Sequence, residues 1–166
     1  STLESGLYKT KLSFITLPQL FKDLMNKVHQ SYPLQNISIT YNVEKHCGGK
    51  IISDSKLIRE AFKHLIDNAI KYSQNKAVKV GCYLSEDKIV FFVKDNGIGI
   101  PVLTNKYLLY KKLFQLNMGP SRSFNGLGVG LAITKKIVEL LNGNIEYCSE
   151  INKGSTFYFS IPLING

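Results

Sequence analysis

Apolar residues recur along the chain at two spacings, one typical of helices and the other of strands. In three segments they return every third or fourth residue, as on the buried side of an amphipathic helix. Pro18 suits the first turn of the first segment, Asp54 suits the N-cap of the second, and Asn142-Gly143 signals the end of the third. The predicted helices run from Pro18 to about Gln30, from the Asp54 cap to about Tyr72, and from about Gly128 to Leu141.

Shorter segments alternate apolar and polar residues, or are rich in β-branched and aromatic ones, which is typical of strands. A polar loop at residues 85–87 joins two of them, and the last two form a closing hairpin. Predicted strands cover residues 14–17, 37–41, 50–53, 77–84, 88–95, 144–149 and 155–161. Their order predicts an α+β fold, a two-layer sandwich in which a mixed, mostly antiparallel sheet packs on about three helices on one face.

The irregular parts of the chain indicate its organisation. Residues 1–12 look like a linker from a segment upstream, and residues 13–166 like one domain. Residues 96–127 are punctuated by glycine and too long for an ordinary loop, which indicates a functional lid or a disordered segment. Nothing resembles a signal peptide, and no window approaches the roughly 18 consecutive apolar residues of a membrane span.

Charge and cysteine content narrow the function classes. The net charge is +9, from 21 basic and 12 acidic residues, which fits an anionic nucleotide or a solvated surface. The lysines are scattered and form no basic stripe with aromatic residues, which argues against nucleic-acid binding. Cys47, Cys82 and Cys148 are far apart without a CxxC motif, so we expect reduced thiols rather than a zinc site or disulfides.

The second predicted helix carries the first chemical signal. Its polar face bears Glu60, His64, Asp67 and Lys71. Asn68 lies at the border with the apolar stripe, where a polar amide must be hydrogen-bonded or face a site. Its oxygen suits a hard cation such as Mg²⁺ that is shared with phosphates, and Lys71 can meet a phosphate. Taken alone, the pattern also fits an ordinary amphipathic helix with a satisfied Asn.

The strand at residues 88–95 ends in Asp95, and Gly97 and Gly99 follow. A half-buried carboxylate accepts a hydrogen bond from a donor such as the exocyclic amine of adenine, whereas guanine presents an oxygen there. The glycines permit close approach of the backbone to a ligand. Taken alone, the segment also fits a plain Asp-Asn-Gly turn.

Three alternating glycines, Gly126, Gly128 and Gly130, open the third predicted helix. Backbone N–H groups at a helix N-terminus form an anion site, so this pattern favours phosphate. It matches neither the dinucleotide fingerprint, which follows a strand in a βαβ unit, nor a P-loop.

In this order, the three segments resemble those of the histidine kinase catalytic domain. His64 to Ser73 resembles its N box, Asp95 to Pro101 its G1 box, Lys112 to Gln115 its F box, Gly126 to Ile133 its G2 box, and Gly154 to Phe157 its final strand. The resemblance covers about residues 13–162. It implies a Bergerat-type ATP-binding fold, shared with gyrase, mismatch-repair and chaperone ATPases.

The resemblance also implies ATP and Mg²⁺ as ligands. Asn68 would coordinate Mg²⁺, while Lys71 and Lys112 would meet phosphate, which makes these residues the catalytic candidates. Asp95 would bind the adenine amine, with Thr156 supporting it through water, and residues 102–127 would form a mobile ATP lid. The other implied nucleotide contacts are Tyr72, Gly97, Gly99, Ile100, Arg122, Gly126, Leu127, Gly128, Gly130 and Leu131.

By the same resemblance, the chain would transfer the γ-phosphate of ATP to a histidine on a separate dimerisation domain, for relay to a response regulator. His29, His46 and His64 lack the following acidic residue that marks an acceptor, so we expect the acceptor upstream. The chain would work in the cytoplasm as part of a membrane-anchored bacterial sensor kinase that forms a homodimer.

Departures from the family pattern keep other readings open. His64 stands where ATP-hydrolysing relatives have Glu, which argues against a self-contained ATPase. Two roles remain open for His64: a supporting hydrogen bond or packing. Lys112 and Leu113 replace the common Arg and Phe of the F box. The alternatives are an anti-sigma-factor-type serine kinase of the same fold, or a degenerate module that binds partners but not ATP.

Overall fold

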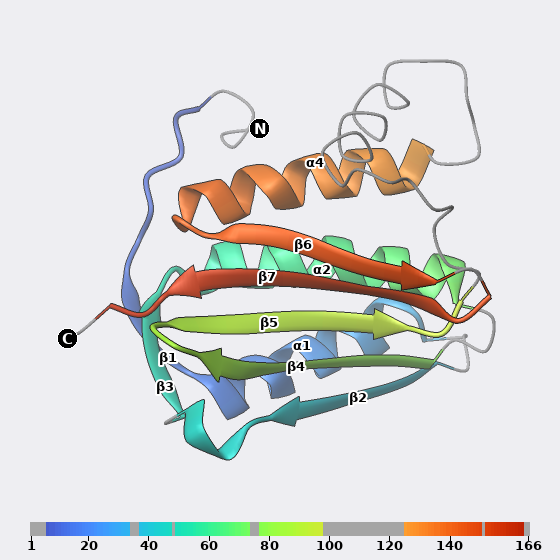
Figure 1. Ribbon diagram of the computed structural model, residues 1–166, viewed down its shortest axis with the longest axis horizontal. Helices are drawn as coiled ribbons and strands as arrows, with labels where there is room; N and C mark the ends of the chain where they lie inside the picture. The colour runs from blue at the N-terminus through green and yellow to red at the C-terminus, as the bar shows by residue number, and fades with distance from the viewer. Residues whose placement is uncertain are drawn as a thin grey trace.

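The computed structural model describes residues 6–33, 37–47, 49–73, 77–97, 125–150 and 152–164 (Figure 1). Its helices are α1 (Leu17–Ser31), α2 (Ser55–Tyr72) and α4 (Asn125–Leu140), with a short 3-10 helix η1 (Lys45–Cys47). Its strands are β1 (Ser13–Thr16), β2 (Ser38–Val43), β3 (Lys50–Ser53), β4 (Ala77–Ser85), β5 (Lys88–Asp95), β6 (Asn144–Glu150) and β7 (Gly154–Pro162).

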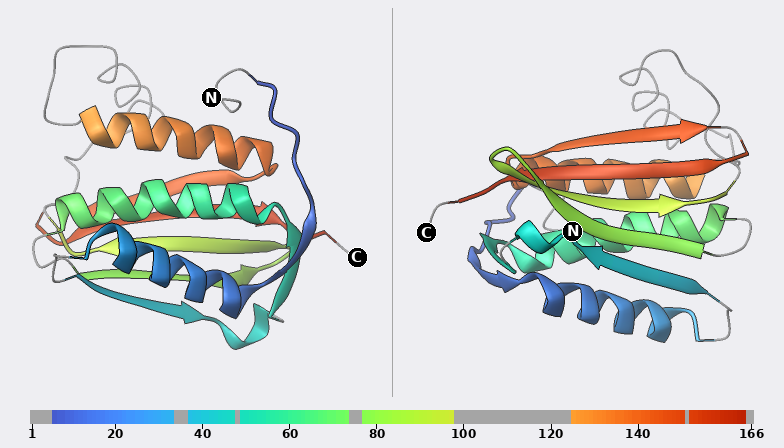
Figure 2. Two further views of the ribbon diagram at one scale, coloured as in Figure 1. Left: turned by 180° about the vertical axis from the view of Figure 1, so that it is seen from behind. Right: turned by 60° about the horizontal axis from the view of Figure 1, so that its bottom comes forward.

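The main sheet has five strands in the order β2-β4-β5-β7-β6. Only β2 and β4 run parallel; the other neighbours are antiparallel. All three α-helices lie on one face of this sheet, as the view from behind shows (Figure 2). The predicted α+β sandwich, with a mostly antiparallel sheet covered by helices on one face, is therefore confirmed.

A second, two-stranded sheet was not expected from the sequence. Strands β1 and β3 pair antiparallel, with Phe14 opposite Ile52, and stay separate from the main sheet. Both segments were predicted as strands, but their partners are set by contacts across the chain. This small sheet lies at the N-terminal end of α1, where Pro18 occupies the first turn as predicted.

Four phenylalanine rings join the helices to the sheet. Phe62 of α2 makes edge contacts with Phe21 of α1, Phe91 of β5 and Phe159 of β7, at centroid distances of 5.4, 5.5 and 5.1 Å. All four side chains are fully buried. Since aromatic pairs favour such edge-to-face geometry, this cluster fixes α2 over the middle of the sheet.

Helix α2 begins at the predicted cap. The Asp54 side chain accepts a hydrogen bond from the Leu57 N–H at 3.1 Å. It also accepts from the Tyr8 hydroxyl at 2.9 Å and the Lys11 N–H at 2.8 Å. The same carboxylate therefore caps α2 and holds part of the segment that we expected to be a linker.

Helix α4 starts earlier than predicted, at Asn125 rather than Gly128, because the glycine-rich segment continues the helix. Its end agrees with the prediction. Asn142 adopts a positive φ of 59°, and the Gly143 N–H donates to the Val138 carbonyl at 2.9 Å. These bonds satisfy the last carbonyl groups of the helix in the manner of a Schellman motif.

The hairpin between β4 and β5 is tighter than predicted. Ser85 pairs with Lys88, so the turn consists of Glu86 and Asp87, and Glu86 has a positive φ of 57°. The three cysteines are free, as expected. The Cys47 and Cys82 thiols are buried 3.9 Å apart, and burial raises the pKa of both.

Candidate functional site

Asn68 lies on the side of α2 that faces α4. Its side chain is 8% exposed, and its Nδ2 atom has no hydrogen-bond partner among the residues that the structure describes. An unpaired buried amide costs about 1–3 kcal/mol. Such a group is retained where something outside the described chain segments satisfies it, so Asn68 has the properties of a ligand-facing residue.

Gly130 is the point where α4 comes closest to Asn68. A Cβ atom at Gly130 would lie 3.4 Å from Asn68 Nδ2, 3.7 Å from Asn68 Oδ1 and 3.6 Å from His64 Cβ. Thr134 donates its hydroxyl to the Gly130 carbonyl at 2.7 Å, and Leu131 is buried in the core at 1% exposure. Two of the sequence motifs, far apart along the chain, therefore meet at this helix contact.

The predicted phosphate segment coincides with a helix N-terminus. Gly126, Leu127 and Gly128 lie in the first turn of α4, which begins at Asn125. The first N–H groups of a helix lack partners within the helix and carry the positive end of its dipole. This end of α4, which precedes the contact of Gly130 with Asn68, is thus suited to an anion.

Asp95 ends β5 on the face that is turned toward the helices. Its partner across the strand pair is Val78, which is buried in the core. Oδ1 of Asp95 accepts from the Gly97 N–H at 2.9 Å and from the Ser155 N–H at 3.3 Å. Both bonds engage the same oxygen, so within the described segments Oδ2 is left for another donor.

Burial controls the charge of this carboxyl. Asp95 is 8% exposed, and desolvation raises its pKa above the ordinary value. The two backbone N–H groups act in the opposite direction because they stabilise the ionised form. A carboxylate held in an apolar setting interacts more strongly with a matching donor than an exposed one would.

Close backbone packing brings Asp95 to the end of α2. A Cβ atom at Gly97 would collide with the Tyr72 carbonyl oxygen and come within 3.1 Å of Asp95 Oδ1. Gly154, with a φ of 103°, packs against the Asp95 carbonyl in the same way. The Ser73 hydroxyl also donates to Asn96 Oδ1 at 3.1 Å. Only glycine fits at both positions, so the N-box and G1-box segments are held together by the backbone.

Lys71 and Tyr72 complete this end of α2. Lys71 is exposed, and its Nζ atom lies 5.4 Å from the centroid of the Tyr72 ring. The Tyr72 hydroxyl is buried and has no hydrogen-bond partner among the described residues. An exposed cation and a hydroxyl without a partner in the described segments therefore lie about one turn from Asn68.

The strand register gives Thr156 a different position from the one expected. Thr156 pairs with Lys94, which is exposed on the sheet face opposite to the helices. Ser155, which is 6% exposed, instead contacts Asp95 through its N–H. Side chains alternate between the two faces of a strand, so Ser155 lies on the same face as the buried Phe157 and Phe159. This alternation could have identified Ser155 as the residue next to Asp95.

Among the described residues, His64 has one partner. Its Nε2 atom lies 3.4 Å from Glu60 Oε2, one turn earlier on α2. His64 also lies beside Gly130, so it supports the contact between α2 and α4. Several predicted site residues lie outside the described residues: Gly99, Ile100, Lys112, Arg122 and the F box at residues 112–115. The same holds for residues 102–124 of the lid predicted at 102–127, whereas its last three residues belong to α4.

The described residues contain no group of three or more His, Cys, Asp or Glu side chains that could hold a metal ion. No helix in the described segments is long and apolar enough to cross a membrane.

Residues 53–165 match the family model described as histidine kinase-, DNA gyrase B-, and HSP90-like ATPase. The chain is 30% identical over 164 residues to the circadian input-output histidine kinase CikA of Synechococcus elongatus, an alignment that covers 98% of this chain and 22% of CikA. Across four such curated relatives, the chain spans 15% to 30% of their length.

Two solved structures resemble the fold. Full-length ShkA in complex with AMPPNP superposes with a TM-score of 0.80 at 19% identity, covering 99% of this chain and 34% of that one. The catalytic domain of the histidine kinase ThkA superposes with a TM-score of 0.71 at 22% identity, covering 92% of this chain and 95% of that one.

Proposed function

This chain belongs to the family of histidine kinase-, DNA gyrase B- and HSP90-like ATPases, and we propose that it is the ATP-binding catalytic domain of a two-component sensor histidine kinase. The observation that carries this proposal is the convergence of three separated motifs around the second half of α2. Asn68 meets Gly130 there, and Gly97, whose N–H donates to Asp95, meets Tyr72.

Asp95 reads the adenine ring. Its carboxylate is buried, and both of its backbone hydrogen bonds go to Oδ1, so Oδ2 can accept the exocyclic amine of adenine. Guanine has an oxygen at that position, which would leave two acceptors facing each other without a proton. The backbone N–H groups of Gly97 and Ser155 favour the ionised form of the carboxyl group and orient it.

Asn68, Lys71 and the start of α4 bind the phosphates. Mg²⁺, when bound, would neutralise charge on the phosphate oxygens during transfer. Oδ1 of Asn68 would be its protein ligand, and the unpaired Nδ2 group would donate to a phosphate oxygen, since the amide lies beside Gly130 of the helix whose N-terminus suits an anion. The exposed Lys71 would meet a phosphate as a point charge. Lys112 and Arg122 would add charge from the predicted lid.

The acceptor is a histidine on another domain. A neutral imidazole nitrogen needs no strong base to attack phosphorus, so this chain supplies mainly positioning and electrostatic stabilisation. His64 fits a supporting role because it is paired with Glu60. The phosphoacceptor domain of the same protein and a response regulator would be the partners, and the domain would work in the cytoplasm.

The direct test is a calorimetric titration of the chain with ATP and Mg²⁺, compared with Asp95→Asn. We expect this substitution to weaken ATP binding by about 10²-fold or more. The amide oxygen would keep the bonds from Gly97 and Ser155, so an NH₂ donor would replace Oδ2 opposite the adenine amine. Asp87→Asn, in the exposed β4–β5 turn, makes the same change in charge and is expected to bind as the unmodified chain does.

Equal binding of ATP by Asp95→Asn and the unmodified chain would contradict the proposed adenine site.

A second measurement distinguishes a histidine kinase from a serine kinase. Incubation with radiolabelled ATP and a separate histidine-bearing dimerisation domain is expected to give an acid-labile phosphoramidate. An acid-stable phosphate ester would instead favour a serine kinase of the same fold.

A further inference from the structure

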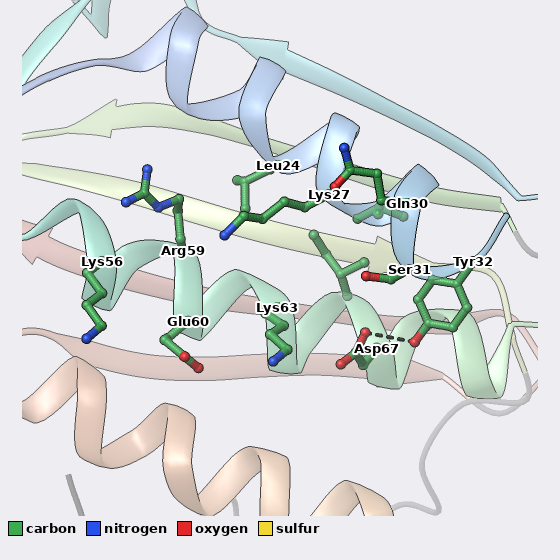
Figure 3. Close-up of a pocket in the computed structure, with 12 residues that line it drawn as sticks. Leu24, Lys27, Gln30, Ser31, Tyr32, Lys56, Arg59, Glu60, Lys63 and Asp67 are labelled. Atoms are coloured by element: carbon green, nitrogen blue, oxygen red, sulfur yellow. Dashed lines mark hydrogen bonds between the residues drawn. The ribbon is translucent and has the colours of Figure 1, made fainter. Parts of the chain in front are cut away.

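A groove of about 590 Å³ lies between α1 and α2, away from the proposed nucleotide site (Figure 3). Its apolar floor consists of Leu24 and Val28 of α1 and Ile66 of α2, which are 3%, 8% and 1% exposed. None of the residues proposed to contact nucleotide lines it. Its size is within the usual range for ligand pockets, so it is a candidate binding surface in its own right.

Cations predominate along the walls of this α1–α2 groove. Lys27 of α1 and Lys56, Arg59 and Lys63 of α2 line it. In Figure 3, Arg59 extends from α2 toward α1, and the amino group of Lys27 reaches into the same gap. Within the described part of the chain, no ion pair or side-chain hydrogen bond engages Lys27, Arg59 or Lys63. Like charges in one gap repel each other unless an anion joins them.

The two acidic residues of the groove already have partners. Asp67 Oδ1 accepts a hydrogen bond from the Tyr32 hydroxyl at 2.8 Å, which Figure 3 shows as a dashed line. Glu60 Oε2 lies 3.4 Å from His64 Nε2. Within the described segments neither carboxylate forms an ion pair with the cations of the groove, and four cations outnumber two carboxylates, so the groove is complementary to an acidic ligand.

The sequence indicates that such a ligand comes from outside this chain. Among its 12 Asp and Glu residues, Glu4 is the only one that lies outside the described segments. Residues 98–124, the longest segment that is not described, contain Lys and Arg but no Asp or Glu. The chain therefore offers no acidic segment of its own that could fill the groove.

We propose that the α1–α2 groove binds an acidic, partly aliphatic peptide segment of a partner protein. The cations are spread along α2 rather than gathered around one point, which fits an extended peptide better than a small anion. From Lys56 to Lys63, α2 rises by about 10 Å, the length of about three extended residues. Carboxylates would meet Lys27 and Arg59, and an aliphatic side chain would cover the apolar floor.

The test uses the whole chain and a short fluorescent peptide in which aspartate alternates with leucine. Binding is followed by anisotropy for the unmodified chain and for Lys27→Glu combined with Arg59→Glu. The matched control combines Lys79→Glu with Lys88→Glu, which changes the net charge equally at exposed positions outside the groove. We expect the groove variant to lose affinity by about tenfold or more, and the control by less than about threefold.

Three results would overturn the proposal. Equal losses in both variants would mean general attraction to the basic chain. Equal binding of a peptide with serine in place of leucine would mean that the apolar floor is not used. Displacement of the peptide by inorganic tripolyphosphate at similar concentration would mean a small-anion site.

Folding is checked by circular dichroism. If the groove double variant does not fold, the single change Lys63→Glu, at an exposed position on the same wall, carries the test with the same expected direction. ATP binding by the folded variants is expected to be unchanged. The test of the groove can therefore fail or succeed independently of the test of the nucleotide site.

Discussion

At the scale of single residues, Asp95 shows a conflict between folding and binding. Burial makes its ionised form unfavourable, and two backbone N–H groups offset only part of that cost, so the pKa of the carboxyl is raised. Within the described segments no cation pairs with this carboxylate, and its bonds come from backbone N–H groups. A buried charge that the fold tolerates but does not require is typical of a functional site.

Asp95→Asn is therefore expected to unfold at the same temperature as the unmodified chain, or a higher one, at pH 7 without nucleotide. The amide avoids the desolvation cost and can keep the bonds from Gly97 and Ser155. Because the folded-state pKa is raised, the unmodified chain gains stability as the pH falls through that pKa. The difference between the two proteins should thus shrink toward acid pH in thermal unfolding. A large loss of stability in the variant at pH 7 would contradict this view.

At the scale of secondary-structure elements, local signals set most boundaries. Asp54 begins α2 and Asn142 ends α4 because each satisfies backbone groups that a helix leaves unpaired. Asp54 has a further role that its sequence position does not indicate, since it also accepts bonds from Tyr8 and Lys11. One residue thereby couples helix capping to the position of the N-terminal segment.

Asp54→Ala is expected to lower the free energy of unfolding by about 2 kcal/mol or more, since it removes a cap and leaves two further donors unpaired. Urea titration followed by circular dichroism measures the change. Thr16→Ala is the matched control, because Thr16 is the N-cap of α1 but makes no side-chain capping bond. A similar small loss for both variants would show that the network around Asp54 contributes little.

At the scale of the whole molecule, the site depends on how α2, α4 and the sheet are packed. Phe62 fixes α2 over the sheet, and Gly130 lets α4 approach Asn68. The nucleotide site and the α1–α2 groove then use different sides of the same helix. A change in the position of α2 would therefore alter both the nucleotide site and the groove.

The substitution Asn68→Ala tests whether Asn68 is the ligand of Mg²⁺ in this site. We expect the unmodified chain to bind ATP more tightly with Mg²⁺ than with EDTA, and the variant to show a ratio of about one, since the amide ligand is lost. Titration calorimetry gives both affinities. Asn42→Ala, at an exposed position on β2, is expected to keep the Mg²⁺ effect. If Asn68→Ala kept the full effect of Mg²⁺ on ATP binding, Asn68 would not be the metal ligand.

The sequence by itself determined the helices, the strands and the motifs, because capping, periodicity and glycine spacing act between residues close along the chain. Only the tertiary structure decided which strands pair, so the separate β1–β3 sheet and the contact of Ser155 rather than Thr156 with Asp95 came from the register. The same holds for the groove. Its cations come from two helices whose distance depends on the core, and no local pattern along the chain encodes that distance.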